Sequence, residues 1–333
     1  MLKKYFFNIL YTIAICLAGC SPEADKAEWL WHVGDQATFD GQISSDGQHL
    51  LIAQAGAGVQ IWHVGTKKAL FHWQHQSNQN SDIFITRFSS DNLYVVTASP
   101  TEFALWRVSD GKALGFWQIT DARIRDIAVS AQAQVILIGQ SDGKVVSFEP
   151  RNGRRTTFLA HQDKINSVAI SPSGEFAISG SNEYVAYFWR VDTGDVIHRF
   201  VHPNRVTKVA LDQNGAFLFT ADSQGQAHIW QQASGQRQAT LNLAQQQRMF
   251  NTARFNHDST QLVTGSPDRT LELWQTKNGL LVKSFTVNPK PNSKTRSAVV
   301  YSAAFHPSNH SLVSFSSSGY LEQWSYHDAS VRK

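Results

Sequence analysis

The stretch INSVAISPSGEFAISGSNEYVAYFW (residues 165–189) decides the fold. It contains three short runs of β-branched and aromatic residues, at 167–170, 176–179 and 184–189. A Ser-Pro-Ser-Gly segment separates the first two runs, and a fourth run (196–200) follows Asp-Thr-Gly. Such runs bounded by Gly, Pro, Asp and Ser are typical of antiparallel strands joined by tight turns. The stretch therefore predicts three strands of a small sheet, with a fourth strand after them.

The same pattern occurs seven times along the chain. The third run of each copy ends in an aromatic residue, and these residues lie 41 to 50 positions apart: Trp62, Trp106, Phe148, Trp189, Trp230, Trp274 and Trp324. A run ending in small residues precedes each aromatic, as in LVTGS (262–266), and turns such as Asn278-Gly279 follow. Repetition with a period of 40 to 50 residues indicates a repeat architecture.

The repeat resembles the WD40 family, whose four-stranded units form the blades of a β-propeller. The copy LVTGSPDRTLELW (262–274) is nearest to the family pattern, and the resemblance covers residues 27–333. It implies an all-β, seven-bladed propeller of four-stranded antiparallel blades. The chain departs from the family in one obvious respect, because no aspartate follows any of the seven aromatic residues.

The hydrogen-bonded tetrad of the family is eroded as well. His161 and His202 stand at its histidine position, and Glu183 and Gln224 face them at its aspartate position. Two aspartates stand at the aspartate position without a histidine, namely Asp142 and Asp268. In this alignment no blade keeps both partners, so the polar tie is predicted to be replaced or missing.

The two ends of the chain predict how the ring closes. Only nine residues (325–333) follow the seventh aromatic, which is too few for a turn and a full strand. Residues 28–33, EWLWHV, form a strand pattern with no preceding partner. We therefore expect this N-terminal strand to complete blade seven and remove an exposed edge. Trp29 and Trp31 share one face of it and are predicted to pack against blade seven, with a membrane interface as the alternative contact.

The first residues have the features of a targeting segment. Lys3 and Lys4 precede a mostly apolar run (5–17) that is too short for a transmembrane helix. The sequence Leu-Ala-Gly-Cys (17–20) resembles the lipobox of bacterial lipoproteins. The resemblance implies that residues 1–19 are removed as a signal peptide and that Cys20 is lipidated. A plain secretory signal is the alternative.

Lipidation at Cys20 would define the rest of the organisation. Residues 20–26 would be the lipidated cysteine and a short tether, and 27–333 would be the propeller. Cys16 would leave with the signal, so the mature chain would carry no free thiol and no disulfide. Because Ser21 follows the cysteine, the resemblance implies anchoring in the outer membrane, facing the periplasm, if the host is Gram-negative.

We find no catalytic motif in the sequence. There is no Gly-rich phosphate loop followed by a helix. His72 and His75 have His-x-x-His spacing, but residues i and i+3 of a strand point to opposite faces, so both are interpreted as surface histidines. We predict a protein that is not an enzyme and holds no metal or cofactor. The alternative is a propeller enzyme or small-ligand binder that uses the central channel.

Basic residues precede the first strand in three successive repeats. Arg123, Lys164 and Arg205 are 41 positions apart, and Arg248 lies one place earlier in the sixth repeat. In the WD40 family this position lies on the face formed by the outer-to-inner connections, where partners usually dock. We predict an arc of cations that attracts an anionic partner, with separately solvated charges as the alternative.

A long basic loop, residues 288–296, extends the predicted binding face. Its cations are Lys290, Lys294 and Arg296, and loops on a rigid scaffold often carry binding sites. The net charge of +4 is low for a nucleic-acid-binding protein, so no nucleic-acid partner is expected. The sequence thus predicts a lipid-anchored, non-catalytic interaction scaffold of the bacterial envelope. Its partner would be a protein or an anionic envelope component.

Overall fold

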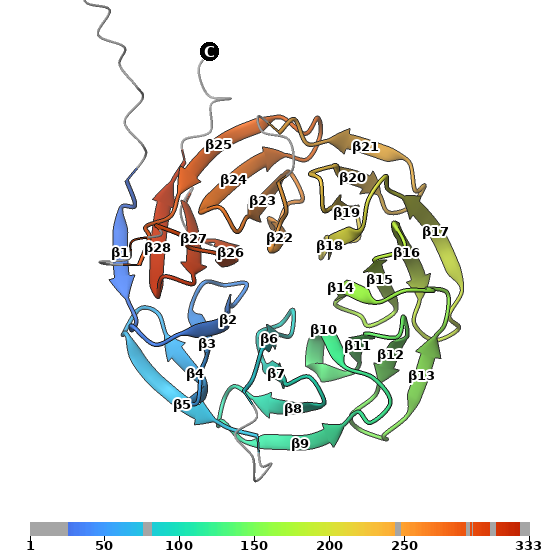
Figure 1. Cartoon of the computed structure of the whole chain (residues 1–333), viewed down its shortest axis with the longest axis horizontal. Coiled ribbons are helices and arrows are strands. Elements are labelled where there is room, and N and C mark those ends of the chain that lie inside the picture. Colours follow the sequence, from blue (N-terminus) through green and yellow to red (C-terminus); the bar gives the residue numbers. More distant parts are fainter. Residues whose placement is uncertain are drawn as a thin grey trace, which may run out of the picture.

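The computed structural model describes residues 26–75, 82–243, 248–290, 294, 296–306 and 311–326. They form seven four-stranded antiparallel sheets arranged as a ring (Figure 1). The predicted all-β, seven-bladed propeller is confirmed. Within the described residues no helix is long and apolar enough to cross a membrane. The signal segment (1–19), Cys20 and the tether up to residue 25 lie outside them.

Blades one to six are each built from four consecutive strands, and blade seven borrows one from the other end of the chain. Blades one to three contain β2 (Thr38–Ile43), β3 (His49–Gln54), β4 (Gly58–His63), β5 (Lys68–Trp73), β6 (Ile85–Phe88), β7 (Tyr94–Ala98), β8 (Glu102–Arg107), β9 (Ala113–Gln118), β10 (Ile124–Val129), β11 (Ile136–Gln140), β12 (Val145–Phe148) and β13 (Arg155–Phe158), with a 3₁₀ turn at Ala131–Ala133.

Blades four to six contain β14 (Ile165–Ile170), β15 (Phe176–Ser181), β16 (Val185–Arg190), β17 (Val196–Val201), β18 (Val206–Leu211), β19 (Phe217–Asp222), β20 (Ala227–Gln231), β21 (Arg237–Thr240), β22 (Thr252–Phe255), β23 (Gln261–Gly265), β24 (Thr270–Gln275) and β25 (Leu281–Thr286). Blade seven contains β26 (Val300–Phe305), β27 (Ser311–Ser316), β28 (Tyr320–Ser325) and β1 (Trp29–His32). The strands that line the centre of the ring are β2, β6, β10, β14, β18 and β22 in blades one to six and β26 in blade seven, as Figure 1 shows.

The small residues that end the second strands allow the blades to approach closely. A Cβ atom on Gly180 of β15 would lie 2.5 Å from Val206 Cγ1 of the next blade, and one on Gly139 of β11 would lie 2.6 Å from Ile165 Cγ2. The second and third strands are therefore packed on both faces, which explains their nearly continuous apolar sequence. The outer strand β5, by contrast, is mostly exposed.

The N-terminal strand closes the ring. β1 pairs antiparallel with β28, with Trp29 opposite Gln323 and His32 opposite Tyr320. The backbone N–H of Val33 extends this pairing by donating to the carbonyl of Gly319 at 2.9 Å. The predicted closure by the first strand is confirmed, and it leaves blade seven with four strands like the others.

The tryptophans of β1 contact two blades instead of one. Both pack against a cluster that includes Val313 and Leu321 of blade seven, as predicted. The ring of Trp31 also lies edge-on to Trp62 of blade one, with centroids 5.6 Å apart, because one face of the closing strand is turned toward that blade. The predicted packing against blade seven is therefore confirmed, and the contact with blade one is additional.

A buried hydroxyl connects the second and third strands in five blades. In each, the indole N–H of the terminal tryptophan donates to a Ser or Thr Oγ at 2.8 to 3.3 Å; the pairs are Trp106–Thr97, Trp189–Ser179, Trp230–Thr220, Trp274–Thr264 and Trp324–Ser314. In three of these blades a histidine ring nitrogen lies 2.8 to 2.9 Å from the same hydroxyl, namely His75, His161 and His202. The polar tie is thus retained in these blades.

One prediction about this network was wrong, and one neighbour was not foreseen. The carboxylate beside His202 is Asp222, 3.7 Å from its Nδ1; it lies two positions before Gln224, which stands at the aspartate position of the repeat. His75 is not a surface histidine: its side chain is 1% exposed, and its Nδ1 lies 3.7 Å from Glu102. The segment between β5 and β6 is longer than the corresponding segments before β14 and β18. Because of this length, His75 could not be aligned with the histidine position of the other repeats.

Candidate functional site

The inner strands of all seven blades enclose a cavity of about 450 Å³ along the axis of the ring. Charged side chains from several of these strands face it: Asp40 (β2), Arg87 (β6), Asp126 (β10), Lys208 (β18) and Arg254 (β22). Neighbouring members of this set are 39 to 82 residues apart in the sequence, so no short motif contains them.

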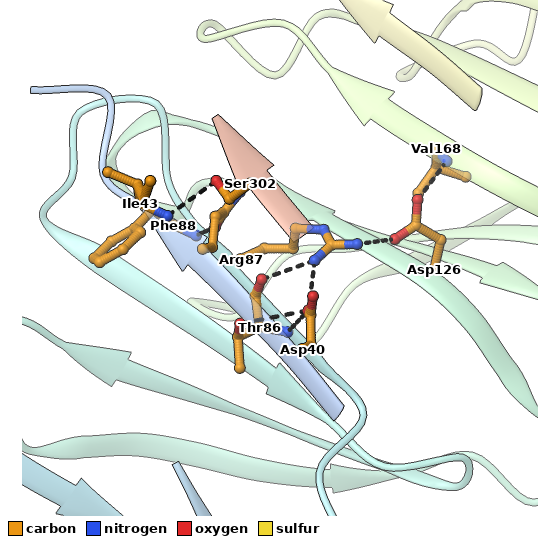
Figure 2. Close-up of polar contacts among 9 residues, drawn as sticks. Asp40, Ile43, Thr86, Arg87, Phe88, Asp126, Val168 and Ser302 are labelled. Carbon is orange, nitrogen blue, oxygen red and sulfur yellow. Dashed lines mark hydrogen bonds and ion pairs between the residues drawn. The ribbon is translucent and has the colours of Figure 1, made fainter. Parts of the chain in front are cut away.

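Arg87 holds two carboxylates from the neighbouring blades (Figure 2). Its guanidinium donates to Asp40 and to Asp126, each at 2.8 Å. Burial opposes the charge of Arg87, but Asp126 and Asp40 outweigh it and raise the pKa of the guanidinium. Each carboxylate also accepts a backbone N–H, Asp40 from Thr86 and Asp126 from Val168. This ionic triad joins the inner strands of blades one to four.

Shorter side chains make the same kind of connection elsewhere in the channel. Ser302 accepts the backbone N–H of Ile43 at 3.1 Å, which links blade seven to blade one (Figure 2). Ser167 accepts the N–H of Val209 at 3.3 Å, which links blades four and five. The described residues contain no group of three His, Cys, Asp or Glu that could hold a metal ion. The arginine, aspartate and serine side chains named here therefore join adjacent inner strands.

The predicted cations Arg123, Lys164 and Arg205 occupy equivalent places on one face of the ring. The carbonyl of each accepts a backbone N–H from the turn after the second strand, donated by Ser141, Asn182 and Ser223 at 2.9 to 3.0 Å. Arg123 and Arg205 are exposed and Lys164 is half-buried. The structure thus places these three cations on successive blades three, four and five.

Arg248 does not join this arc, contrary to the prediction. Its guanidinium turns inward and pairs with Glu272 of β24, and its Nε lies 3.4 Å from Asp268. The side chain is buried, because a desolvated cation is stabilised by carboxylates and would be costly without them. The sequence predicted that Asp268 would occupy the aspartate position of its repeat without a histidine partner. In the structure its neighbour is Arg248.

The basic loop after β25 is fixed at its start. Asn288 donates through its backbone and side-chain nitrogens to the buried carboxylate of Glu322, at 3.1 and 2.7 Å. Lys290 donates to the carbonyl of Asp35 at 2.7 Å. Lys294 and Arg296 are exposed, while residues 291–293 and 295 of this loop lie outside the described residues.

Exposed apolar side chains accompany the three cations, and the sequence reasoning missed them. Leu159 follows β13 and is 67% exposed, Tyr184 lies in the turn before β16 and is 48% exposed, and Val201 ends β17 and is 59% exposed. The N–H of His202 donates to the carbonyl of Tyr184 at 2.8 Å, so Tyr184 and Val201 are neighbours. We call the surface formed by these three residues with Arg123, Lys164 and Arg205 the loop face.

The comparisons with known proteins agree with the repeat seen in the structure. Residues 153–190, 194–231 and 238–275 match the model of the WD domain, G-beta repeat. These segments are WD40 repeats. Each runs from the outer strand of one blade through three strands of the next, as β13 does with β14, β15 and β16.

A solved structure shares the whole architecture. A chain from "Crystal Structure of Mitotic Checkpoint Complex" aligns with a TM-score of 0.74 and 16% sequence identity, over 98% of this chain and 100% of that one. At this identity the likeness shows the fold alone. Together with the WD40 repeats of the central blades, it supports the same propeller for the blades that the family model does not match.

Proposed function

We propose that this protein is a non-catalytic interaction scaffold that binds an acidic protein partner at the loop face. The observation that carries the proposal is that Leu159, Tyr184 and Val201, each roughly half exposed or more, lie on the same face of the ring as three cations. Apolar anchors surrounded by polar residues are the usual composition of a protein interface. The rigid ring would present these side chains in a fixed arrangement, at little entropic cost on binding.

Charge would select the partner. Arg123, Lys164 and Arg205 lie at the same position of neighbouring blades, so their fields add toward solvent and favour an acidic surface. The channel offers less to a catalytic role, because both carboxylates of the triad already hold Arg87 and a backbone N–H. A scaffold of this kind makes and breaks no covalent bond.

Site-specific photo-crosslinking tests the docking surface. Tyr184→p-benzoylphenylalanine should crosslink one acidic protein in the cell envelope, and Arg123→Glu with Lys164→Glu and Arg205→Glu should abolish that product. Leu93→p-benzoylphenylalanine is the matched control, because Leu93 is 53% exposed in the turn between β6 and β7, on the opposite face. Reversing Lys112, Arg151 and Lys277, on turns of that same opposite face, should leave the crosslink intact.

Two results would contradict the proposal. One is an equal product from position 93, which would show that the contact is not specific to the loop face. The other is a product at position 184 that survives the triple reversal, which would show that the three cations play no part in docking. The purified triple variant should keep the thermal midpoint of the unmodified chain, since these exposed charges stabilise the fold little.

We also propose that Cys20 carries the lipid anchor and holds the propeller at the periplasmic side of an outer membrane. The lipobox-like sequence at 17–20 supports this, as does the absence of any other cysteine after Cys16. Acyl chains anchor firmly because each buried methylene contributes roughly 0.8 kcal/mol. Cys20→Ala should abolish incorporation of labelled palmitate and release the protein from membranes. Full labelling of the Ala variant would exclude Cys20 as the lipidation site.

A further inference from the structure

The channel carries an excess of positive charge. Among the described residues that line the cavity, the cations are Arg87, Arg125, Lys208 and Arg254, and the anions are Asp40 and Asp126. The guanidinium of Arg87 already forms an ion pair with one oxygen of each carboxylate. The remaining cations therefore face the cavity without a dedicated carboxylate of their own.

Lys208 is the most exceptional of these cations. It lies on β18, half-buried, and its ammonium group makes no hydrogen bond to any of the described residues. Burial lowers the pKa of this lysine, and the charges that it faces are Asp126, Arg87, Asp40 and Arg254. An ammonium group has three donors, and leaving all of them without a protein acceptor in a partly desolvated site is unfavourable.

Arg254, on the neighbouring strand β22, is only partly satisfied. Its guanidinium donates to the carbonyls of Ile43 and Ser44, at 3.1 and 3.4 Å. No carboxylate of the described residues lies within 4 Å of it. Burial lowers the pKa of Arg254 to about 10. With five N–H donors available on a guanidinium, several remain for a ligand.

We propose that the channel binds a small organic anion, carrying phosphate or carboxylate, between Lys208 and Arg254. Such a group supplies the acceptors and the negative charge that both side chains lack, and charge-assisted contacts of this kind are strong. The cavity of about 450 Å³ lies within the usual range for small-molecule sites, about 300 to 1,000 Å³. This second site is independent of the protein contacts proposed for the loop face.

Isothermal titration of the full-length protein with inorganic phosphate and with citrate, at constant ionic strength, tests the proposal. We expect saturable binding of at least one probe, and the stronger binder identifies the headgroup. Lys208→Met and Arg254→Met should each weaken it about tenfold or more, the effect of losing one charge-assisted contact. Arg107→Met removes a surface cation that does not line the channel; it is the control and should bind the probe normally.

Thermal unfolding of the Lys208→Met variant supplies a second readout. Because Lys208 makes no hydrogen bond within the described part of the chain, its removal should not disrupt the fold, and without a probe the variant should unfold at a higher temperature than the unmodified protein. Adding the bound probe should raise the midpoint of the unmodified protein and leave that of the variant nearly unchanged. A rise of equal size in both would reflect general anion exclusion and would overturn the proposal, as would failure of both probes to bind. Crosslinking through position 184 is unaffected by either outcome.

Discussion

Replacing Arg87 by methionine removes the cation of the ionic triad and leaves Asp40 and Asp126 facing each other. The three side chains are at most 24% exposed, so their carboxylates would remain poorly solvated. Removing one member of a buried ion pair typically costs 3 to 5 kcal/mol. Because the channel admits some water, we expect the lower end, a loss of about 3 kcal/mol in the free energy of unfolding.

Urea denaturation followed by tryptophan fluorescence measures this loss as a lower midpoint with an unchanged slope. Arg107→Met is the matched control, because Arg107 pairs with Asp110 at 2.7 Å on the surface, where both side chains are more than a third exposed. We expect it to cost less than about 1 kcal/mol. The deficit of Arg87→Met should also shrink as the pH falls toward 5, since burial already raises the pKa of Asp40 and protonation of this carboxyl removes the repulsion. Equal midpoints for the two variants would refute a structural role for the triad.

Three further predictions concern stability. Trp31→Ala should lower the free energy of unfolding by about 2 kcal/mol, less than a fully buried tryptophan would, because it contacts both blades beside the closing strand; an unchanged urea midpoint would show that ring closure does not depend on it. Burial raises the pKa of Glu322 from its ordinary 4.5 to about 7, although Asn288 donates to it. The contribution of Glu322 to the free energy of unfolding is therefore fully present below pH 4.5 and is lost as the pH rises through 7, by about 3 kcal/mol in total. Glu322→Gln should flatten the profile of stability against pH over that range. His75→Ala should cost about 2 kcal/mol and His72→Ala less than about 0.5 kcal/mol; equal effects in thermal unfolding would contradict the burial of His75.

The repeat was predictable because each blade has to solve the same packing problem. The terminal aromatic, the small residues after the second strand and the turn glycines recur where neighbouring sheets approach, as Gly180 does against Val206. Closure was predictable for a related reason, since a strand pattern at 28–33 lacked a partner. The repeat can be recognised from local sequence, and the closure follows from counting the strands of the last repeat, which is one short.

The polar interior was less predictable, because its partners come from different repeats. Arg87 meets Asp40 and Asp126, which lie 47 and 39 residues away, and no spacing rule marks such contacts. Arg248 was misplaced because sequence position cannot tell an inward guanidinium from an outward one. The apolar part of the loop face was missed for the same reason, since Tyr184 reads as part of a strand until its exposure is known.

Ring closure also has a consequence for biosynthesis. β1 is made first, yet its hydrogen-bonding partner β28 is among the last segments made. Until translation is nearly complete, β1 has no strand to pair with, and the faces of blades one and six that blade seven covers stay exposed. Exposed apolar surface and an unpaired strand both promote association with other molecules, and contacts between distant segments form slowly. A chain that stops short of blade seven would therefore be prone to aggregate, even though most of its blades are complete.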